Sequence, residues 1–215
     1  MQSSRPRILI ADDHTLVAEL CRKLLEAEFQ VVGTVNNGRA MVRAAAELRP
    51  DIIVVDVAMP ILNGLDAGQQ VKELLPAVKL IFLTMNNDIE LAAEAFRRGA
   101  SGYLLKTCAA SEMVNAVHDV RSGKSYMSKS LRKEEVNYLR RTETKLIEED
   151  ERLTERQREV LQLLAEGKVM KEIADILNMT TRTVAFHKYR MMETIGAKSN
   201  AELVRYAVRH HIVAA

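Results

Sequence analysis

The sequence predicts two domains of different fold class, an α/β domain followed by a small all-α domain. Over the first 121 residues, five short apolar runs alternate with five amphipathic segments, the pattern of parallel strands joined by helices. From residue 153 onward the pattern is helical. A chain of 215 residues is long enough for two domains that each bury a core. We therefore expect a five-stranded doubly wound parallel sheet in the flavodoxin-like order 2-1-3-4-5, joined to a four-helix domain.

The elements of the α/β domain follow from these alternating patterns. The expected strands are residues 7–11, 30–35, 51–55, 79–83 and 102–105. The expected helices are residues 15–28, 38–48, 63–75, 87–98 and 110–121. In the first of these helices, the apolar stripe that we expect to be buried is Leu16, Leu20, Leu24 and Leu25.

The third expected strand ends at a carboxylate. Residues 52–55 form an unbroken apolar run, typical of a strand buried on both faces, and Asp56 follows at once. Pro60 cannot donate a ladder hydrogen bond, and Asn63-Gly64 has turn and helix-start chemistry. Asp56 is therefore expected where open α/β sheets place their ligand crevice, which makes it the first candidate for chemistry.

Other polar residues follow the remaining central strands. Asp12 and Asp13 come after the first strand, Thr84 after the fourth and Lys106 after the fifth. Because the carboxyl ends of parallel strands meet at one edge, these side chains should converge with Asp56. Carboxylates a few ångströms apart repel by roughly 4 kcal/mol per pair at an effective dielectric constant near 20, so the cluster favours a divalent cation. Hard oxygen ligands favour magnesium over zinc or copper.

Each of these residues also has a purely structural interpretation. Asp12 or Asp13 could cap a helix, Thr84 could be a strand-end hydroxyl, and Lys106 could be a solvated loop charge. Tyr103, three residues before that lysine, could be a core aromatic. The order of the whole set at successive strand ends favours one shared site over these separate explanations.

Four short helices are expected in the C-terminal domain. Thr154 with Gln157, and Ser199 with Glu202, have the spacing of capping boxes that open the first and the last helix. The first helix should run up to residue 167 and the last to about residue 210, with the second at 171–177 and the third at 181–194. The tight turn between the second and third helices predicts a helix-turn-helix.

A helical wheel of residues 181–194 separates two stripes. The stripe expected in the core is Val184, Met191 and Ile195. The surface expected to contact DNA consists of Arg182, Ala185, Phe186, Lys188, Tyr189 and Arg190. Arg182 could donate to guanine, Phe186 and Ala185 could pack on thymine methyl groups, and Lys188 would lie near phosphates. The alternative is that an exposed Phe186 marks a protein contact.

Composition and charge set the remaining expectations. Residues 153–215 hold ten Lys or Arg against seven Asp or Glu, whereas residues 1–128 hold fourteen against fifteen, so the basic excess lies in the C-terminal domain. Cys21 and Cys108 lack metal-type spacing and are expected as reduced thiols.

No apolar run resembles a signal peptide or a membrane span, which predicts a cytoplasmic protein without membrane contact. We expect domains at residues 1–126 and 151–215, with residues 127–150 as a charged, helical linker.

Two parts of the chain resemble known families. Asp13, Asp56 with Met59-Pro60 and Asn63-Gly64, Thr84 and Lys106 together resemble the receiver domain of two-component response regulators. Residues 153–207 are similar to the LuxR-type helix-turn-helix of the NarL/FixJ group. The resemblance implies a phosphorylation-controlled transcription factor rather than an enzyme, with a cognate histidine kinase as phosphodonor. It also implies double-stranded DNA as a ligand and a homodimer on activation.

The resemblance assigns roles to individual residues. Asp56 would accept the phosphoryl group, and Asp13, Asp56 and the carbonyl of Ala58 would bind Mg²⁺, with Asp12 reaching it through water. Lys106 and Thr84 would contact the phosphoryl group. Tyr103 would be the aromatic that turns inward when Thr84 moves toward the phosphate.

Two departures from the family patterns stand out. Thr107 occupies the position after the lysine where receivers often have Pro, and Ala185 replaces the usual basic residue of the Thr-Val-Lys-x-His pattern.

A phosphatase with an Asp nucleophile is a second hypothesis, but its Asp-x-Asp pattern does not match Ala11-Asp12-Asp13-His14. A constitutive DNA binder is the third hypothesis, and the intact acid cluster argues against it.

Overall fold

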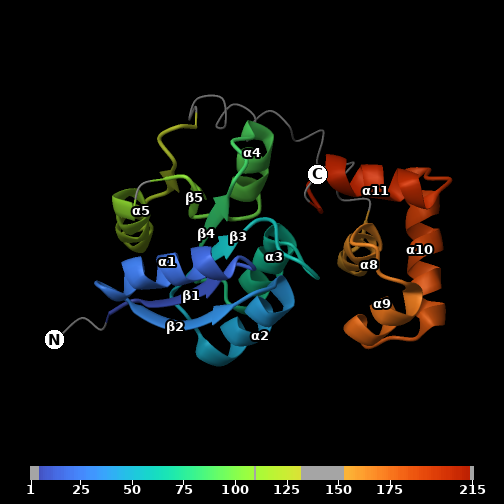
Figure 1. The fold of residues 1–215 in the computed structure, drawn as a ribbon, viewed down its shortest axis with the longest axis horizontal. Helices are drawn as coiled ribbons and strands as arrows, with labels where there is room; N and C mark the ends of the chain where they lie inside the picture. Colours follow the sequence, from blue (N-terminus) through green and yellow to red (C-terminus); the bar gives the residue numbers. More distant parts are fainter. Residues whose placement is uncertain (1–4, 109, 132–152, 214–215) are drawn as a thin grey trace. The chain divides into compact units, whose positions relative to one another are not determined.

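The computed structural model describes residues 5–108, 110–131 and 153–213. The chain divides into two compact units, Met1–Thr142 and Glu143–Ala215, which are considered separately below (Figure 1). Within the described residues, no helix has the combination of length and apolarity that a bilayer span requires. Most of the expected linker, residues 132–150, lies outside the described residues.

The first unit is a parallel sheet between two helical layers. Its strands are β1 (Arg7–Ala11), β2 (Gln30–Val35), β3 (Ile52–Asp56), β4 (Lys79–Thr84), β5 (Gly102–Leu105) and β6 (Tyr126–Met127). Its helices are α1 (Thr15–Glu26), α2 (Gly38–Leu48), α3 (Gly64–Leu74), α4 (Ile89–Arg97) and α5 (Ala110–Arg121). The strand order β2-β1-β3-β4-β5-β6 confirms the predicted 2-1-3-4-5 topology and adds one strand to it.

The prediction of five strands was wrong by one short strand. β6 pairs in parallel with β5, and the Ser128 amide donates to the Tyr103 carbonyl at 2.9 Å. Leu131, a few residues further on, is buried in the same core cluster as Tyr103. A two-residue strand is too short to show alternation in a sequence, so the sequence pattern does not indicate that Tyr126–Met127 joins the sheet. Met127, Ser128 and Leu131, which lie inside the predicted linker, are therefore buried in this unit.

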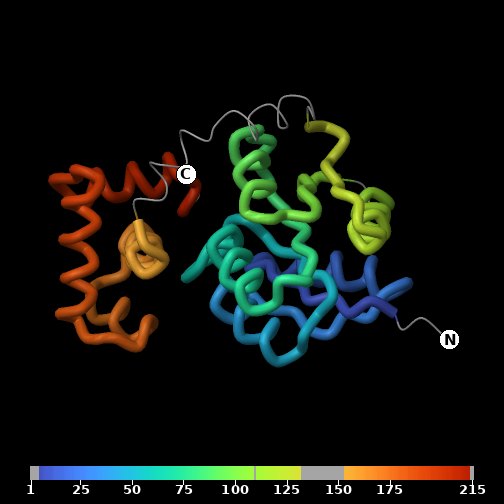
Figure 2. The backbone as a smooth tube through the Cα atoms, turned by 180° about the vertical axis from the view of Figure 1, so that it is seen from behind, coloured from blue at the N-terminus to red at the C-terminus, as the bar shows by residue number. Residues whose placement is uncertain are grey.

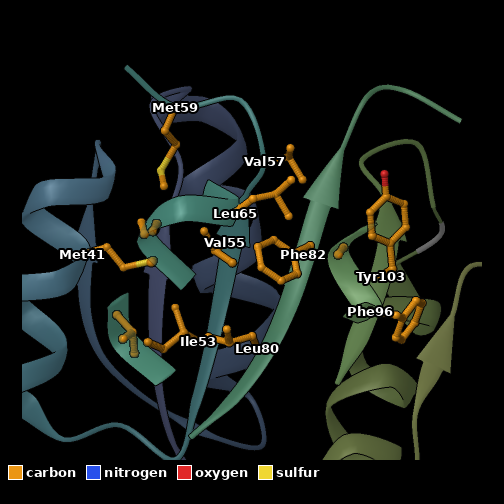
Figure 3. Packing of buried hydrophobic residues seen from close by; sticks show 14 of the residues in the cluster. Met41, Ile53, Val55, Val57, Met59, Leu65, Leu80, Phe82, Phe96 and Tyr103 are labelled. Atoms are coloured by element: carbon orange, nitrogen blue, oxygen red, sulfur yellow. The ribbon is translucent and has the colours of Figure 1, made fainter. Parts of the chain in front are cut away.

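The sheet has a hydrophobic core on each face. Alternate side chains of β3 enter opposite cores, Ile53 and Val55 on one side and Ile52 and Val54 on the other. Residues of α2, α3 and α4 complete the first core, and residues of α1 and α5 complete the second. Figure 1 shows these layers, and Figure 2 shows them from behind. Figure 3 shows the side chains of the first core.

The buried stripe predicted for α1 is confirmed at Leu25 and wrong at Leu16 and Leu20, while Leu24 is half-buried. Leu16 is 81% exposed and Leu20 is 58% exposed, whereas Ala18, Cys21 and Leu25 face the core. The small side chains of Ala18 and Cys21 pack on the core beside Leu25, whereas Leu16 and Leu20 point outward. Apolar periodicity alone selects Leu16 and Leu20 and does not show that Ala18 and Cys21 occupy the buried positions.

Over its described residues, 153–213, the second unit is a four-helix domain. Its helices are α8 (Glu155–Ala165), α9 (Met170–Leu177), α10 (Thr181–Ile195) and α11 (Asn200–Arg209). The capping box at Thr154 is confirmed, since its hydroxyl accepts from the Gln157 amide and Gln157 accepts from the Thr154 amide. The second box is incomplete, because the Glu202 carboxylate accepts from the Lys198 amide at 2.7 Å. The helix-turn-helix prediction agrees with the structure: α9 ends at Leu177, its C-cap Asn178 is in the left-handed region, and α10 begins at Thr181.

Candidate functional site

The central strands of the sheet bring two acids together. Asp12 directly follows β1 and Asp56 ends β3, and these strands are neighbours with Ala11 opposite Val55. Both carboxylates are buried, whereas the Asp13 side chain is about one-third exposed. Asp12, Asp13, His14 and Asp56 each offer a possible metal-ligand atom, and these atoms all lie within 4.8 Å of one another. The predicted convergence of the acids is therefore present in the structure.

Lys106 joins the two buried acids. Its Nζ lies 2.8 Å from Asp56 Oδ2 and 2.8 Å from Asp12 Oδ2, and its side chain is buried. Its amide donates to the Thr84 carbonyl at 2.7 Å, which fixes the backbone at the end of β5. The lysine thus reaches the acid pair with Thr107 following it.

Burial sets the protonation behaviour of this cluster. Burial raises the pKa of Asp56 from 3.8 to about 6, which outweighs the opposing effect of Lys106, and Asp12 raises it further. Burial also acts to lower the pKa of Lys106, but the Asp12 and Asp56 carboxylates hold it above its ordinary value. Three carboxylates face one ammonium group here, so a divalent cation would offset the remaining negative charge.

The loop after β3 is held tightly against the Asp56 backbone. A Cβ atom on Gly64 would lie 2.0 Å from the Asp56 carbonyl oxygen, so only glycine fits at this first residue of α3. The Asn63 side chain accepts from the Asp66 amide and caps the helix. Ile61 has φ +72°, an unfavourable conformation for a branched side chain. Such a constrained loop fixes Ala58, whose amide donates to Asp56 Oδ1 at 3.2 Å.

Thr84 and Tyr103 lie on the two strands beyond the acids. Thr84 ends β4 and is buried, and its hydroxyl accepts from the Asn86 amide at 3.1 Å. Tyr103, in β5, has no exposed surface, and burial raises the pKa of its hydroxyl far above the ordinary value. Its ring lies in the first core near Phe96 (Figure 3). The structure therefore has Tyr103 in an inward orientation.

In the second unit, α10 divides into a buried and an exposed face. Val184 and Met191 are buried, and Ile195 is half-buried. Phe186 is 60% exposed and Tyr189 is 64% exposed. Of the other residues expected to contact DNA, Arg182 and Arg190 are exposed and Ala185 and Lys188 are half-buried. These side chains are thus accessible on the second helix of the helix-turn-helix.

The sequence interpretation missed His14. Its Nδ1 lies 2.9 Å from Asp13 Oδ1, 3.3 Å from Asp12 Oδ1 and 3.9 Å from Asp56 Oδ2. The signal that could have found it is its position directly after two acids at a strand end, in a residue type that ligates metals.

The chain matches two family models. Residues 8–118 match the response regulator receiver domain. Residues 151–207 match the bacterial regulatory proteins of the luxR family. The two matches lie in separate units of the structure.

Curated proteins and solved structures are similar over nearly the whole chain. The transcriptional regulatory protein LnrK of Bacillus subtilis is 36% identical over 96% of this chain and 98% of its own length. The response regulator UvrY of Escherichia coli is 31% identical over 94% of each chain. A structure of RcsB from Salmonella typhimurium is 26% identical, covers 97% of this chain and 99% of its own, and has a TM-score of 0.61. Another RcsB structure, bound to promoter P1flhDC in the presence of phosphomimetic BeF3-, is 27% identical over 94% and 98% of the two chains, with a TM-score of 0.59.

Proposed function

The chain belongs to the response regulators that join a receiver domain to a LuxR-type DNA-binding domain, and from that premise we propose that Asp56 is its phosphoacceptor. The observation that carries this proposal is the ion pair of Lys106 with two buried carboxylates at the strand ends. Asp56 is buried, and its two carboxylate oxygens accept separately from Lys106 Nζ at 2.8 Å and from the Ala58 amide at 3.2 Å. We propose a cognate histidine kinase as the phosphodonor.

The residues of the cluster also fit a divalent cation. Asp13, Asp56 and the Ala58 carbonyl would hold Mg²⁺, with Asp12 acting through water. When bound, the cation supplies positive charge that offsets charge on the phosphoryl oxygens and shields the acids from one another. The fit rests on the 4.8 Å spread of the ligand atoms and on the excess of carboxylates over ammonium groups.

The proposed reaction uses groups that this chain provides. A carboxylate oxygen of Asp56 attacks the phosphorus of a phosphohistidine, the P–N bond breaks, and a mixed anhydride forms on Asp56. Lys106 Nζ, which already lies 2.8 Å from that carboxylate, stabilises negative charge on the transferring group. The Thr84 hydroxyl can donate to a phosphoryl oxygen, and Tyr103 is buried on the neighbouring strand β5.

The test locates the phosphoryl group chemically. The full-length chain is treated with acetyl phosphate and Mg²⁺, then with borohydride, which reduces an acyl phosphate to an alcohol. Peptide mass spectrometry should find homoserine at position 56 and at most one phosphoryl group per chain. Reduction at another acid would refute the assignment of Asp56. Turnover of a generic phosphoester beyond one equivalent, measured separately, would favour the phosphatase hypothesis instead.

We propose that α10 reads the DNA major groove as part of a homodimer. The supporting observations are the exposed Arg182, Phe186 and Tyr189 on one face and the buried Val184 and Met191 on the other. Two copies related by a two-fold axis would read half-sites about one turn of DNA apart.

Replacing Arg182 with Ala should weaken specific DNA binding by about 10-fold or more, because a base-reading arginine contributes about 1–3 kcal/mol. Fluorescence anisotropy at fixed salt, on a duplex selected from random DNA, measures this change. Lys198→Ala is the matched control, since Lys198 is an exposed cation beyond the end of α10. If Arg182→Ala loses as much affinity for random duplexes as for the selected duplex, Arg182 contacts phosphate and does not read a base.

A further inference from the structure

His14 occupies a helix-capping position without capping the helix. It is the N-cap residue of α1, and its side chain makes no cap hydrogen bond. Residues at this position usually accept from the first turn through a side-chain oxygen, which an imidazole ring does not provide. The His14 amide donates to Asp12 Oδ1 at 2.8 Å, and its extended backbone turns the ring toward the acids. A capping role therefore does not account for a histidine here.

The position of the ring fits that of a metal ligand. In octahedral coordination with bonds of about 2.1 Å, adjacent ligand atoms lie about 3.0 Å apart and opposite ones about 4.2 Å apart. Asp13 and Asp56 are the two acids proposed to ligate the cation. His14 Nδ1 lies 2.9 Å from Asp13 Oδ1 and 3.9 Å from Asp56 Oδ2, close to the adjacent and opposite spacings. The side chain is 62% exposed, so a small rotation of the ring is sterically open.

We propose that His14 contributes Nδ1 as a ligand to the cation site, which therefore prefers first-row transition cations such as Mn²⁺, Co²⁺ and Zn²⁺ to Mg²⁺. This inference rests on the proposed function, in which the acid cluster holds a divalent cation. The acids and the Ala58 carbonyl alone form an all-oxygen set that suits Mg²⁺. Adding an imidazole nitrogen raises affinity for transition metals, which bind nitrogen far better than Mg²⁺ does.

The arrangement also explains how Mg²⁺ can still bind. Mg²⁺ keeps several waters in protein sites, so one water can take the place of the nitrogen. His14 then lies beside Asp13, with Nδ1 2.9 Å from Asp13 Oδ1 as in this structure. Loss of His14 should therefore have little effect on Mg²⁺ affinity and a large effect on Mn²⁺ affinity.

The test uses Mn²⁺ as the probe of the full-length chain. Electron paramagnetic resonance titration of free Mn²⁺ gives its Kd, and competition gives the Kd of Mg²⁺. His14→Gln should weaken Mn²⁺ binding by about 10-fold or more and Mg²⁺ binding by less than about 3-fold. Electron spin echo envelope modulation should detect ¹⁴N coupling to bound Mn²⁺ in the wild type and lose it in His14→Gln.

His118→Gln is the matched control, because this half-exposed histidine of α5 pairs with Glu28 and lies outside the cluster. It should retain both the Mn²⁺ affinity and the nitrogen signal. Bound Mn²⁺ without nitrogen coupling in the wild type, or an equal loss of Mn²⁺ and Mg²⁺ affinity in His14→Gln, would overturn the proposal. Either result leaves the phosphoacceptor assignment intact, because borohydride reduction tests Asp56 independently.

Discussion

Asp56→Asn should reduce phosphorylation by acetyl phosphate by about 100-fold or more, because the amide oxygen that replaces the carboxylate is a far weaker nucleophile. Phosphate-dependent dimerisation and DNA retention should be lost with it. The measurements are phosphoryl incorporation by mass spectrometry of the intact chain, and size-exclusion chromatography with and without acetyl phosphate. Unchanged phosphate-dependent behaviour in this variant would place the switch elsewhere.

The same substitution should make the protein more stable at neutral pH. The Asp56 pKa of about 6 in the folded protein lies above its ordinary value of 3.8, so the folded state binds this proton more tightly than the unfolded chain does. The favourable contribution of the neutral carboxyl is complete below about pH 3.8 and is lost as pH rises through 6. That difference corresponds to about 3 kcal/mol at most. The neutral amide avoids this loss, although it also gives up the ion pair with Lys106.

We therefore expect Asp56→Asn to raise the free energy of unfolding by about 1–2 kcal/mol at pH 7.5 without divalent cations, and by less at pH 5. Denaturant unfolding at the two pH values measures this difference. Asp51→Asn is the control, since Asp51 is an exposed carboxylate that immediately precedes β3 and accepts from the Arg7 amide at 2.8 Å. It should leave phosphorylation unchanged. A loss of stability in Asp56→Asn that grows with pH would contradict the effect of burial on this carboxyl.

The receiver site could be predicted because its residues are tied to strand ends. A strand buried on both faces leaves a strong apolar run, and the polar residue after it is then placed by topology. This reasoning located Asp12, Asp56, Thr84 and Lys106 at one edge of the sheet. It could not determine which member of the acid pair contacts the lysine. The structure pairs Lys106 with Asp12 and leaves Asp13 more exposed, because the residue nearest the strand end points into the sheet edge.

Other features depend on packing that a single sequence does not record. The buried face of α1 is formed by Ala18, Cys21 and Leu25, whereas apolar periodicity alone selected Leu16 and Leu20. β6 forms because β5 offers free backbone groups at the sheet edge, and its two residues carry no alternating pattern.

Gly64→Ala should destabilise the receiver domain and disable the phosphorylation site together. The added Cβ would meet the Asp56 carbonyl oxygen at 2.0 Å and Val57 Cα at 3.0 Å, and both are backbone atoms that cannot rotate away. The Gly64 amide also donates to the Val57 carbonyl at 2.8 Å, so relief of the clash breaks this contact. We expect a loss of about 2–4 kcal/mol in the free energy of unfolding and a loss of about 10-fold or more in phosphorylation rate.

Gly68→Ala separates this backbone clash from the general effect of adding a methyl group to α3. Its Cβ would approach Phe82 Cζ at 3.0 Å and Leu80 Cδ1 at 3.1 Å, which are side-chain atoms able to shift by a few tenths of an ångström. Alanine also favours the helix over glycine by about 1 kcal/mol, which offsets the crowding. Gly68→Ala should therefore stay within about 1 kcal/mol of the wild type and keep its phosphorylation rate. If instead Gly64→Ala matches the wild type in urea unfolding and in phosphoryl incorporation, then the loop after β3 does not depend on close contact with the Asp56 backbone.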